Sequence, residues 1–225
     1  MNGLTIVFDL DGTLVDTAPD LVDTLNAILR RQGLPPVPYD VARPLIGGGA
    51  KELLKRGLAA EGLACGPAEV DRLYAQFIAH YTDHIADRSR PFPGLEGALD
   101  HLAAKGCRFA VCTNKLEQLA LLLLDKLGLI ARFAAICGQD TFGVQKPDAE
   151  IFRLTARAAG GRPDRAIMVG DSFTDVRTAR AAGAPIIAVD FGYTQEPVAS
   201  FAPDRIIGHF DALPRAVHEL AAELA

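Results

Sequence analysis

The sequence lacks several features that would place it in a specialised class of protein. Its 225 residues contain no Trp, and its four Cys show no Cys-x-x-Cys spacing. The longest apolar run, 119–124, falls far short of the ~20 residues of a membrane span. The first three residues lead into a strand and leave no room for a secretory signal. We therefore expect a cytoplasmic protein with reduced cysteines and no membrane partner.

The chain also lacks an excess of basic residues. Lys and Arg total 23 against 28 Asp and Glu, which gives a net charge of -5 at pH 7. Binding to nucleic acid requires a clustered basic surface, so we expect no nucleic-acid partner. A hydrophobic content of 49% is typical of an ordinary globular protein. The length indicates one domain with an insertion or two small domains.

Short apolar segments alternate with helical patterns from about residue 94 onward. Such alternation indicates parallel βαβ units with a sheet covered on both faces. We therefore predict an α/β fold with a doubly wound parallel (Rossmann-like) sheet, formed by residues 1–15 and 89–225. The expected strands are 4–8, 108–112, 133–137, 166–169 and 185–189, and the expected helices are 95–105, 115–127, 148–159 and 173–182.

The intervening segment, residues 16–88, has no convincing strand. Leu21, Leu25, Ile28 and Leu29 keep the 3.6-residue period of an amphipathic helix, and further helices are expected over 51–60 and 69–85. We predict an α-helical cap domain inserted after the first strand. An insert at that point is well placed to act as a lid over a site at the strand end.

Two carboxylates, Asp9 and Asp11, follow the first strand where it gives way to a Gly-Thr turn. Residues two apart in an extended chain point the same way, so these side chains can converge at the carboxyl edge of the sheet. Open α/β sheets bind their ligands at that edge. A strand that simply ends in a polar turn is the alternative, because Asp-Gly is a common turn pair.

Later strands also end in polar residues at the expected edge. Thr113 and Asn114 can donate hydrogen bonds to phosphate oxygens, although such a pair could equally cap the following helix. Lys146 precedes Pro147, which fixes the direction of the chain there. A lone lysine is usually a solvated surface charge, but this position favours a functional role.

The segment 170–175 adds Asp171 and Asp175 to the same edge. Clustered carboxylates repel one another unless a hard cation lies among them, and ligands that are all oxygen indicate Mg²⁺. Helix capping would explain Asp171 alone, but not the coincidence of these acids with Asp9 and Asp11. The sequence therefore predicts a magnesium site.

These four segments, in this order, resemble the motifs of the haloacid dehalogenase superfamily of phosphatases. The resemblance extends over essentially the whole chain, because the helical insert is similar to the small α-helical cap of that superfamily. Softer similarities within it point to the bacterial phosphoglycolate phosphatases. The segments that carry the two resemblances are 8–14, 113–114, 146–147 and 170–175 for the superfamily, and 14–21, 45–50 and 191–193 for the phosphoglycolate phosphatases.

The resemblance implies a Mg²⁺-dependent phosphatase that acts on a small anionic phosphate ester, with 2-phosphoglycolate as the favoured substrate. Asp9 would be the nucleophile that becomes an aspartyl-phosphate, and Asp11 would be the general acid and base. Mg²⁺ would be held by Asp9, Asp171 and the backbone carbonyl of Asp11.

The remaining core residues receive supporting roles from the same resemblance. Lys146 would neutralise a phosphate oxygen and orient Asp9, while Thr113 and Asn114 would complete the phosphate cradle. Asp175 would orient Lys146 or a metal-bound water from outside the ligand set. Thr174 stands where relatives often carry Asn.

Rival functions leave different marks on the sequence. A dehalogenase would lack the second acid, Asp11. A β-phosphoglucomutase-like enzyme usually carries an Arg in the cap near Ala50 and Gly-Val after the second Asp, where this chain has Gly12 and Thr13. A non-catalytic phosphate-binding protein would be expected to have lost a core residue. A mutase and a broad sugar-phosphate or pyrophosphate phosphatase remain the open alternatives.

Selectivity for 2-phosphoglycolate would require the cap to meet a carboxylate. Gly47, Gly48 and Gly49 could supply backbone N–H groups before the next helix, and Arg43 or Lys51 could add positive charge. The alternative is that the cations form a solvated face and the glycines a hinge.

Overall fold

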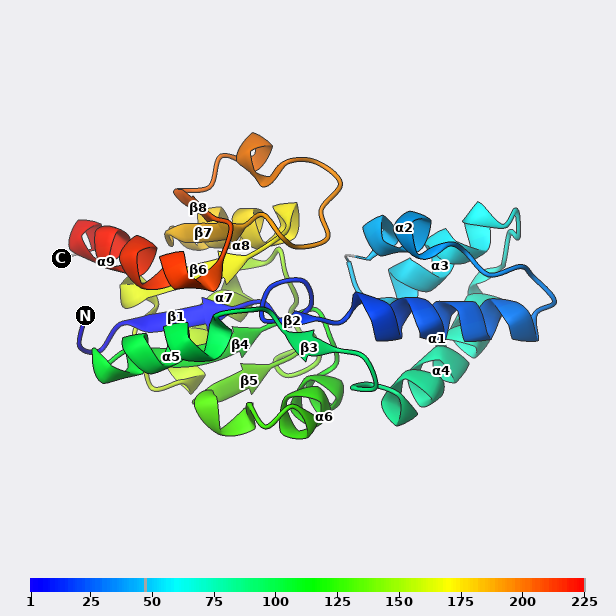
Figure 1. The fold of residues 1–225 in the computed structure, drawn as a ribbon, viewed down its shortest axis with the longest axis horizontal. Coiled ribbons are helices and arrows are strands. Elements are labelled where there is room, and N and C mark those ends of the chain that lie inside the picture. Colours follow the sequence, from blue (N-terminus) through cyan, green and yellow to red (C-terminus); the bar gives the residue numbers. More distant parts are fainter. Residues whose placement is uncertain (47, 225) are drawn as a thin grey trace. The chain divides into compact units, whose positions relative to one another are not determined.

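The computed structural model describes residues 1–46 and 48–224 (Figure 1). The chain folds into two compact units. The core unit comprises Met1–Asp16 and the chain from Pro91 onward, and the helical unit comprises Thr17–Arg90. The helical unit is therefore one insertion in the sequence of the core unit.

The core unit is built on a six-stranded sheet in the order β5-β4-β1-β6-β7-β8, in which all neighbouring strands are parallel. Phe8 of the central strand β1 pairs with Val111 of β4 on one side and with Val169 of β6 on the other. The predicted doubly wound parallel sheet is confirmed. Its strands are β1 (Thr5–Phe8), β4 (Arg108–Cys112), β5 (Ala135–Cys137), β6 (Ala166–Gly170), β7 (Ile186–Val189) and β8 (Arg205–Ile207).

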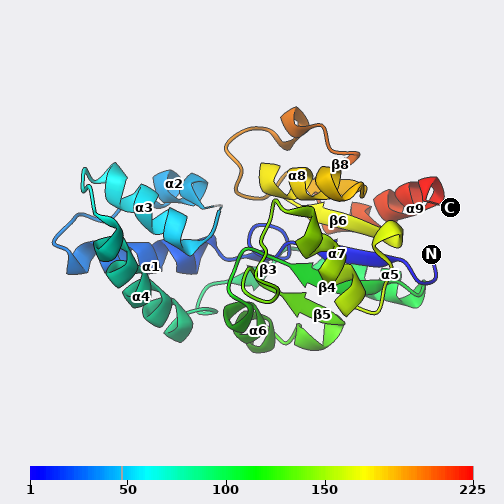
Figure 2. The same ribbon diagram turned by 180° about the vertical axis from the view of Figure 1, so that it is seen from behind.

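Helices cover both faces of this sheet. Opposite views show α7 and α8 on one face and α5 and α9 on the other (Figures 1 and 2). The four residues of β1 are buried because both faces of the strand are covered. The core helices are α5 (Leu95–Ala104), α6 (Glu117–Lys126), α7 (Ala149–Ala158), α8 (Phe173–Ala182) and α9 (Leu213–Glu223), with 3-10 turns at Ile130–Arg132, Pro163–Arg165, Val198–Phe201 and Phe210–Ala212.

The direction in which successive strands are added across the sheet reverses at β1. After β1 the chain builds β4 and β5 on one side, then returns to build β6, β7 and β8 on the other. The carboxyl ends of β1, β4 and β6 therefore meet where the two halves of the sheet diverge. In open α/β sheets this is the usual position of a ligand site.

The helical unit contains α1 (Ala18–Arg31), α2 (Tyr39–Ala42), a 3-10 turn (Arg43–Leu45), α3 (Ala50–Ala60) and α4 (Pro67–Asp83). Leucine and aromatic side chains fill its interior, including Leu25, Leu54 and Phe77. Asp20 at the start of α1 accepts hydrogen bonds from the backbone N–H of Ser89, at 2.8 Å, and from its hydroxyl, at 2.6 Å. These bonds tie the beginning of the unit to its end.

The structure extends the expected pattern in three places. Expected strands end at residue 189, whereas β8 and α9 follow it. Two short strands, β2 (Val15–Asp16) and β3 (Arg90–Pro91), form a second sheet. The helix α2 is a further addition. Strands of two or three residues and a helix of one turn are too short to produce a periodic pattern, whereas α9 has 11 residues and buries apolar side chains at helical spacing.

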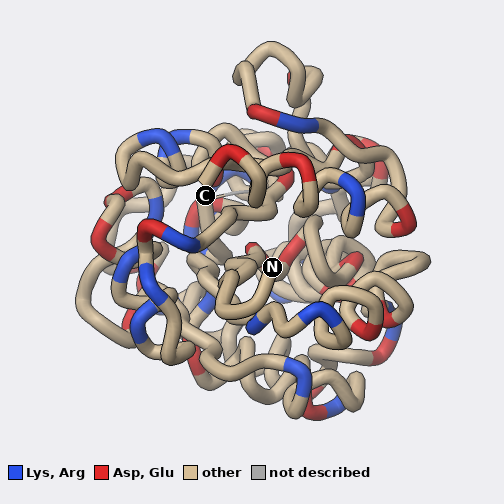
Figure 3. The backbone as a smooth tube through the Cα atoms, turned by 90° about the vertical axis from the view of Figure 1, so that its left-hand side faces the viewer, with Lys and Arg blue, Asp and Glu red and all other residues tan. Residues whose placement is uncertain are grey.

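Acidic and basic residues are mixed at one end of the core unit (Figure 3). At the end of the core unit that Figure 3 faces, basic and acidic positions are interspersed along the backbone. The N-terminus lies at this end, together with α9 (Figures 1 and 3).

The four cysteines are free, and three of them, Cys107, Cys112 and Cys137, are buried.

Candidate active site

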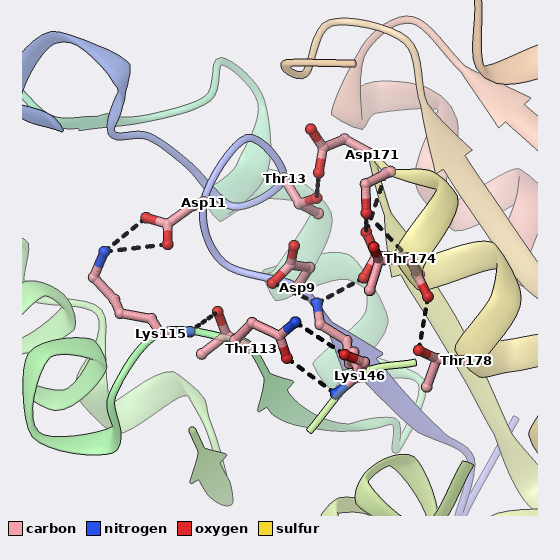
Figure 4. Close-up of polar contacts among 12 residues, drawn as sticks. Asp9, Asp11, Thr13, Thr113, Lys115, Lys146, Asp171, Thr174 and Thr178 are labelled. Atoms are coloured by element: carbon pink, nitrogen blue, oxygen red, sulfur yellow. Dashed lines mark hydrogen bonds and ion pairs between the residues drawn. The ribbon is translucent and has the colours of Figure 1, made fainter. Parts of the chain in front are cut away.

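Asp9 directly follows β1, and its side chain lies in a largely buried position (Figure 4). The backbone N–H of Asp9 donates to the carbonyl of Val169 at 2.9 Å, so the pairing of β1 with β6 continues to this residue. The chain then turns back on itself, with the N–H groups of Leu14 and Val15 donating to the carbonyl of Leu10. The sheet therefore fixes Asp9, and the tight turn fixes the residues after it.

Gly12 in this turn has a backbone conformation with φ of 82°. A Cβ atom there would lie 2.5 Å from Oδ2 of Asp171. The position therefore requires glycine for both its conformation and its close approach to another site residue. The next residue, Thr13, donates from its hydroxyl to Oδ1 of Asp171 at 3.2 Å.

Lys146 joins two of the predicted acids. Its Nζ atom lies 2.8 Å from Oδ1 of Asp9 (Figure 4). It also lies 2.6 Å from Oδ1 of Asp175. Lys146 is 3% exposed and Asp175 is fully buried. Buried charges of this kind are stable only when they are paired. Lys146 is therefore buried in contact with two of the predicted acids and is not a solvated surface charge.

The backbone of Lys146 is held by Asn114. The side-chain oxygen of Asn114 accepts from the N–H of Lys146 at 3.0 Å, and its side-chain nitrogen donates to the carbonyl of Lys146 at 3.1 Å. The Lys146–Pro147 peptide bond is cis. Thr113 is buried beside Asn114, and its Oγ1 atom accepts from the N–H of Lys115 at 3.2 Å. The end of β4 thus supports the loop that carries Lys146.

Asp171 and Asp175 extend from the end of β6 and the first turn of α8. Oδ2 of Asp171 accepts from the backbone N–H of Tyr193 at 2.8 Å. Asp175 takes part in a capping box, in which Ser172 accepts from the N–H of Asp175 and Oδ2 of Asp175 accepts from the N–H of Ser172. The hydrogen bonds that cap α8 therefore also fix the Asp175 carboxylate that contacts Lys146.

Three carboxylates form a group suited to a metal ion. Within the described ranges, Asp9, Asp171 and Asp175 each offer an oxygen that lies within 4.8 Å of the others. Burial raises the pKa of Asp171 to about 8, with the nearby carboxylates of Asp175 and Asp9 adding to the shift. Burial also raises the pKa of Asp9 to about 6, against the lowering effect of Lys146.

Burial is the main cause of both shifts, and the carboxylates nearby add to it. Burial by itself would lower the pKa of Lys146, but Asp175 and Asp9 outweigh burial and raise that pKa above its usual range. One ammonium cannot offset three carboxylates. A hard divalent cation with oxygen ligands fits both the excess charge and the donor set.

Asp11 lies at the same strand end, but its carboxylate is turned to another cation. Nζ of Lys115 lies 2.9 Å from Oδ1 and 3.1 Å from Oδ2 of Asp11 (Figure 4). The expected cluster of acids is therefore divided. Asp9, Asp171 and Asp175 lie close together, with Lys146 in contact with Asp9 and Asp175, while Asp11 has an ion pair with Lys115.

Comparison with known proteins agrees with this geometry. The model of the haloacid dehalogenase-like hydrolases matches residues 4–183. The chain is 50% identical over 208 residues to a phosphoglycolate phosphatase of Mesorhizobium japonicum, covering 92% of each chain. It is 46% identical to a phosphoglycolate phosphatase of Caulobacter vibrioides, covering 96% of this chain and 91% of the relative. The chain belongs to the haloacid dehalogenase-like hydrolase family.

Two solved structures have the same fold as this chain. The structure of a predicted phosphoglycolate phosphatase from Haemophilus somnus superposes with a TM-score of 0.88 at 29% identity, covering 96% of this chain and 97% of the other. CbbY from Rhodobacter sphaeroides, in complex with phosphate, superposes with a TM-score of 0.78 at 25% identity, covering 95% and 96%. The relatives of this haloacid dehalogenase-like hydrolase support phosphoric monoester hydrolase activity.

Two further residues that contact the predicted acids, Lys115 and Tyr193, are not predicted from the sequence. The helical pattern over 115–127 predicts Lys115 as a helical residue, whereas α6 begins at Glu117 and leaves Lys115 in the loop at the strand end. Its position directly after Thr113 and Asn114 was the available signal. Tyr193 follows β7 in a loop, and its local sequence gives no sign that its N–H reaches Asp171.

The predicted selectivity residues lie in the helical unit. Gly49 precedes α3, and its carbonyl accepts from the N–H groups at the start of that helix. Gly48 is exposed, whereas Gly47 lies outside the described residues. Lys51 forms an ion pair with Asp71 of α4, and Arg43 lies in the 3-10 turn.

Among the helices in the described part of the chain, none combines the length and apolar character needed to cross a membrane.

Proposed function

We propose that this hydrolase converts 2-phosphoglycolate and water to glycolate and inorganic phosphate. The observation that carries the proposal is the division of the aspartates: Asp9 lies against Lys146 in a buried group, while Asp11 is held apart by Lys115. Two carboxylates with separate environments suit two chemical roles. The names of the relatives support this choice of substrate.

In the first step, an oxygen of Asp9 attacks phosphorus and the bond to the ester oxygen breaks. Asp11 donates its proton to that oxygen, so that glycolate leaves as the alcohol. In the second step, Asp11 takes a proton from water, and the water oxygen attacks phosphorus. The bond between phosphorus and Asp9 then breaks, which restores the free carboxylate and releases phosphate.

We propose Mg²⁺ as the cofactor, held by Asp9, Asp171 and the backbone carbonyl of Asp11. The bound ion supplies positive charge that lets a carboxylate approach a dianionic phosphate. The grouping of three buried carboxylates around a single ammonium supports this cofactor.

The other core residues act on the phosphate or on each other. Lys146 neutralises a phosphate oxygen and directs Asp9, with which it is already in contact. Thr113 and the backbone N–H of Asn114 donate to the remaining phosphate oxygens. Asp175 touches Lys146 rather than the substrate and acts as a positioning residue.

We also propose that residues 1–15 and 89–225 form the catalytic domain and that residues 16–88 form a cap over it. In this proposal Arg43, Gly48, Gly49 and Lys51 contribute to recognition of the substrate carboxylate. The free cysteines of the core fit a reducing, cytoplasmic location.

A panel of phosphate esters, with pyrophosphate added, tests the proposed substrate. Release of phosphate in the presence of MgCl₂ is measured for 2-phosphoglycolate, glucose 6-phosphate, β-glucose 1-phosphate, nucleoside monophosphates and pyrophosphate. We expect kcat/KM to be highest for 2-phosphoglycolate, and Asp9→Asn to abolish turnover of every ester. Conversion of β-glucose 1-phosphate to glucose 6-phosphate would instead identify a mutase. Similar kcat/KM values across the panel would identify a broad phosphatase.

A further inference from the structure

Lys115 is a second buried cation at the edge of the sheet. It precedes α6, and its side chain is 5% exposed. Its backbone is fixed at both ends, because its N–H donates to Oγ1 of Thr113 and its carbonyl accepts from the N–H of Gln139 at 3.1 Å. Its ammonium contacts both carboxylate oxygens of Asp11 (Figure 4). The lysine is therefore presented to the site rather than to solvent.

The two buried lysines divide the site between them. Lys146 contacts Asp9 and Asp175, which places it on the side of the nucleophile. Lys115 contacts Asp11, which in the proposed function gives its proton to the leaving oxygen. Lys115 therefore lies on the side where the organic part of the substrate leaves, and it has no assigned role in the transfer of phosphate.

The chemistry of 2-phosphoglycolate connects this cation to the substrate. A single CH₂ group separates the leaving oxygen from the carboxylate carbon. When Asp11 reaches the leaving oxygen, an ammonium in contact with Asp11 is within a few bond lengths of the substrate carboxylate. An ammonium has three N–H donors and can serve two carboxylates together.

We propose that Lys115 binds the carboxylate of the substrate and thereby determines specificity. The inference rests on the proposed function and deepens it by naming a core residue that recognises the leaving group. A carboxylate has two oxygens that accept several hydrogen bonds, so contacts from the helical unit are compatible with it. An ester with the same alkyl oxygen but no carboxylate gains nothing from Lys115.

The test compares Lys115→Met with the unmodified chain on three substrates in MgCl₂. These are 2-phosphoglycolate, ethyl phosphate, which is an alkyl ester without the carboxylate, and 4-nitrophenyl phosphate, whose leaving group needs little protonation. The measured quantity is the ratio of kcat/KM for 2-phosphoglycolate to that for ethyl phosphate. We expect this ratio to fall by about 10- to 100-fold, as for the loss of one charge-assisted hydrogen bond.

Two further variants separate charge from packing. Lys115→Arg retains a cation and should restore part of the ratio, whereas Lys115→Gln retains only a neutral donor and should not. Lys126→Met removes an exposed lysine from the last turn of α6 and should leave all three substrates unchanged. Thermal unfolding of each variant shows that the fold is retained, and Lys115→Gln serves if Lys115→Met does not fold.

Other outcomes overturn the inference. If both alkyl esters lose kcat/KM equally while the aryl ester is spared, Lys115 acts only by positioning Asp11. If all three substrates respond equally, Lys115 is structural. Failure of the proposed function is recognised separately, because the unmodified chain would then show no preference for 2-phosphoglycolate over ethyl phosphate.

Discussion

The side chain of Asn114 holds the backbone of Lys146 rather than the Lys146 side chain. Both the N–H and the carbonyl of Lys146 are hydrogen-bonded to the amide group of Asn114, at 3.0 Å and 3.1 Å. The two residues belong to loops that are 32 positions apart in the sequence. The pair therefore fixes the origin of the Lys146 side chain, whose ammonium then reaches Asp9 and Asp175.

Replacement of Asn114 by Ala tests this arrangement. The change leaves two partly buried backbone groups without their partner, which we expect to cost about 1–3 kcal/mol of unfolding free energy. It should also lower kcat, because Lys146 is less well placed against Asp9. Denaturant unfolding and steady-state kinetics measure the two effects. Unchanged stability and unchanged kcat in Asn114→Ala would contradict this interpretation.

The two aspartates at the end of β1 should respond differently to removal of charge. Asp9→Asn is nearly isosteric but cannot attack phosphorus, so we expect no measurable turnover. Asp11→Asn removes general acid and base assistance, which is typically worth ~10²–10⁴-fold. Its residual activity should be greatest with 4-nitrophenyl phosphate. Phosphate release with each ester is the measurement, and normal turnover by Asp9→Asn would exclude Asp9 as the nucleophile.

Fluoride complexes of beryllium and aluminium should inhibit the enzyme in the presence of Mg²⁺. They imitate an aspartyl-phosphate and its transition state, which the site should bind more tightly than the substrate. Inhibition constants and the rise in the thermal midpoint measure their binding. Asp9→Asn is the control, since it lacks the carboxylate that coordinates these complexes. Lack of inhibition by both complexes would argue against covalent transfer of phosphate.

Much of the fold and part of the site could be predicted from the sequence. Short continuous apolar runs locate the central strands, because both faces of these strands are buried, and the 3.6-residue pattern locates most helices to within a few residues. Parallel strands also bring their carboxyl ends to one edge. For that reason Asp9, Lys146, Asp171 and Asp175 could be grouped before their contacts were known.

The remaining contacts depend on loop conformations that a local pattern does not encode. The pair of Lys115 with Asp11 joins residues 104 positions apart. The N–H of Tyr193 reaches Asp171 from a loop that follows β7. Each contact depends on the conformation of an irregular loop, and the periodicity of side chains does not determine that conformation.

The stability of the metal-free protein should decrease as pH rises. The pKa of Asp171 is about 8 in the fold, against an ordinary value of 3.8, so the folded state binds more protons than the unfolded chain between these values. The corresponding stability is present below about pH 4 and is lost as pH rises through about 8. Thermal unfolding in EDTA across this range measures the trend.

Mg²⁺ should reverse this loss. Binding requires the deprotonated carboxylates, so the rise in the thermal midpoint on adding MgCl₂ should be greater at about pH 8.5 than at about pH 6. Asp171→Asn is the control and should weaken both the pH trend and the response to Mg²⁺. An equal response at the two pH values, retained in Asp171→Asn, would show that the ion binds elsewhere.

The predicted role of the helical unit in selectivity can be tested with Arg43 and Lys51. We expect Arg43→Ala and Lys51→Ala to raise KM or lower kcat/KM for 2-phosphoglycolate by about 10-fold or more, as for loss of a charge-assisted hydrogen bond, and to leave 4-nitrophenyl phosphate unchanged. Lys51 already forms an ion pair with Asp71, so Asp71→Asn is the matched control for loss of that pair. If Asp71→Asn lowers kcat/KM as much as Lys51→Ala, the ion pair stabilises the helical unit and Lys51 does not contact the carboxylate. Equal responses of the two substrates would exclude either cation from its recognition.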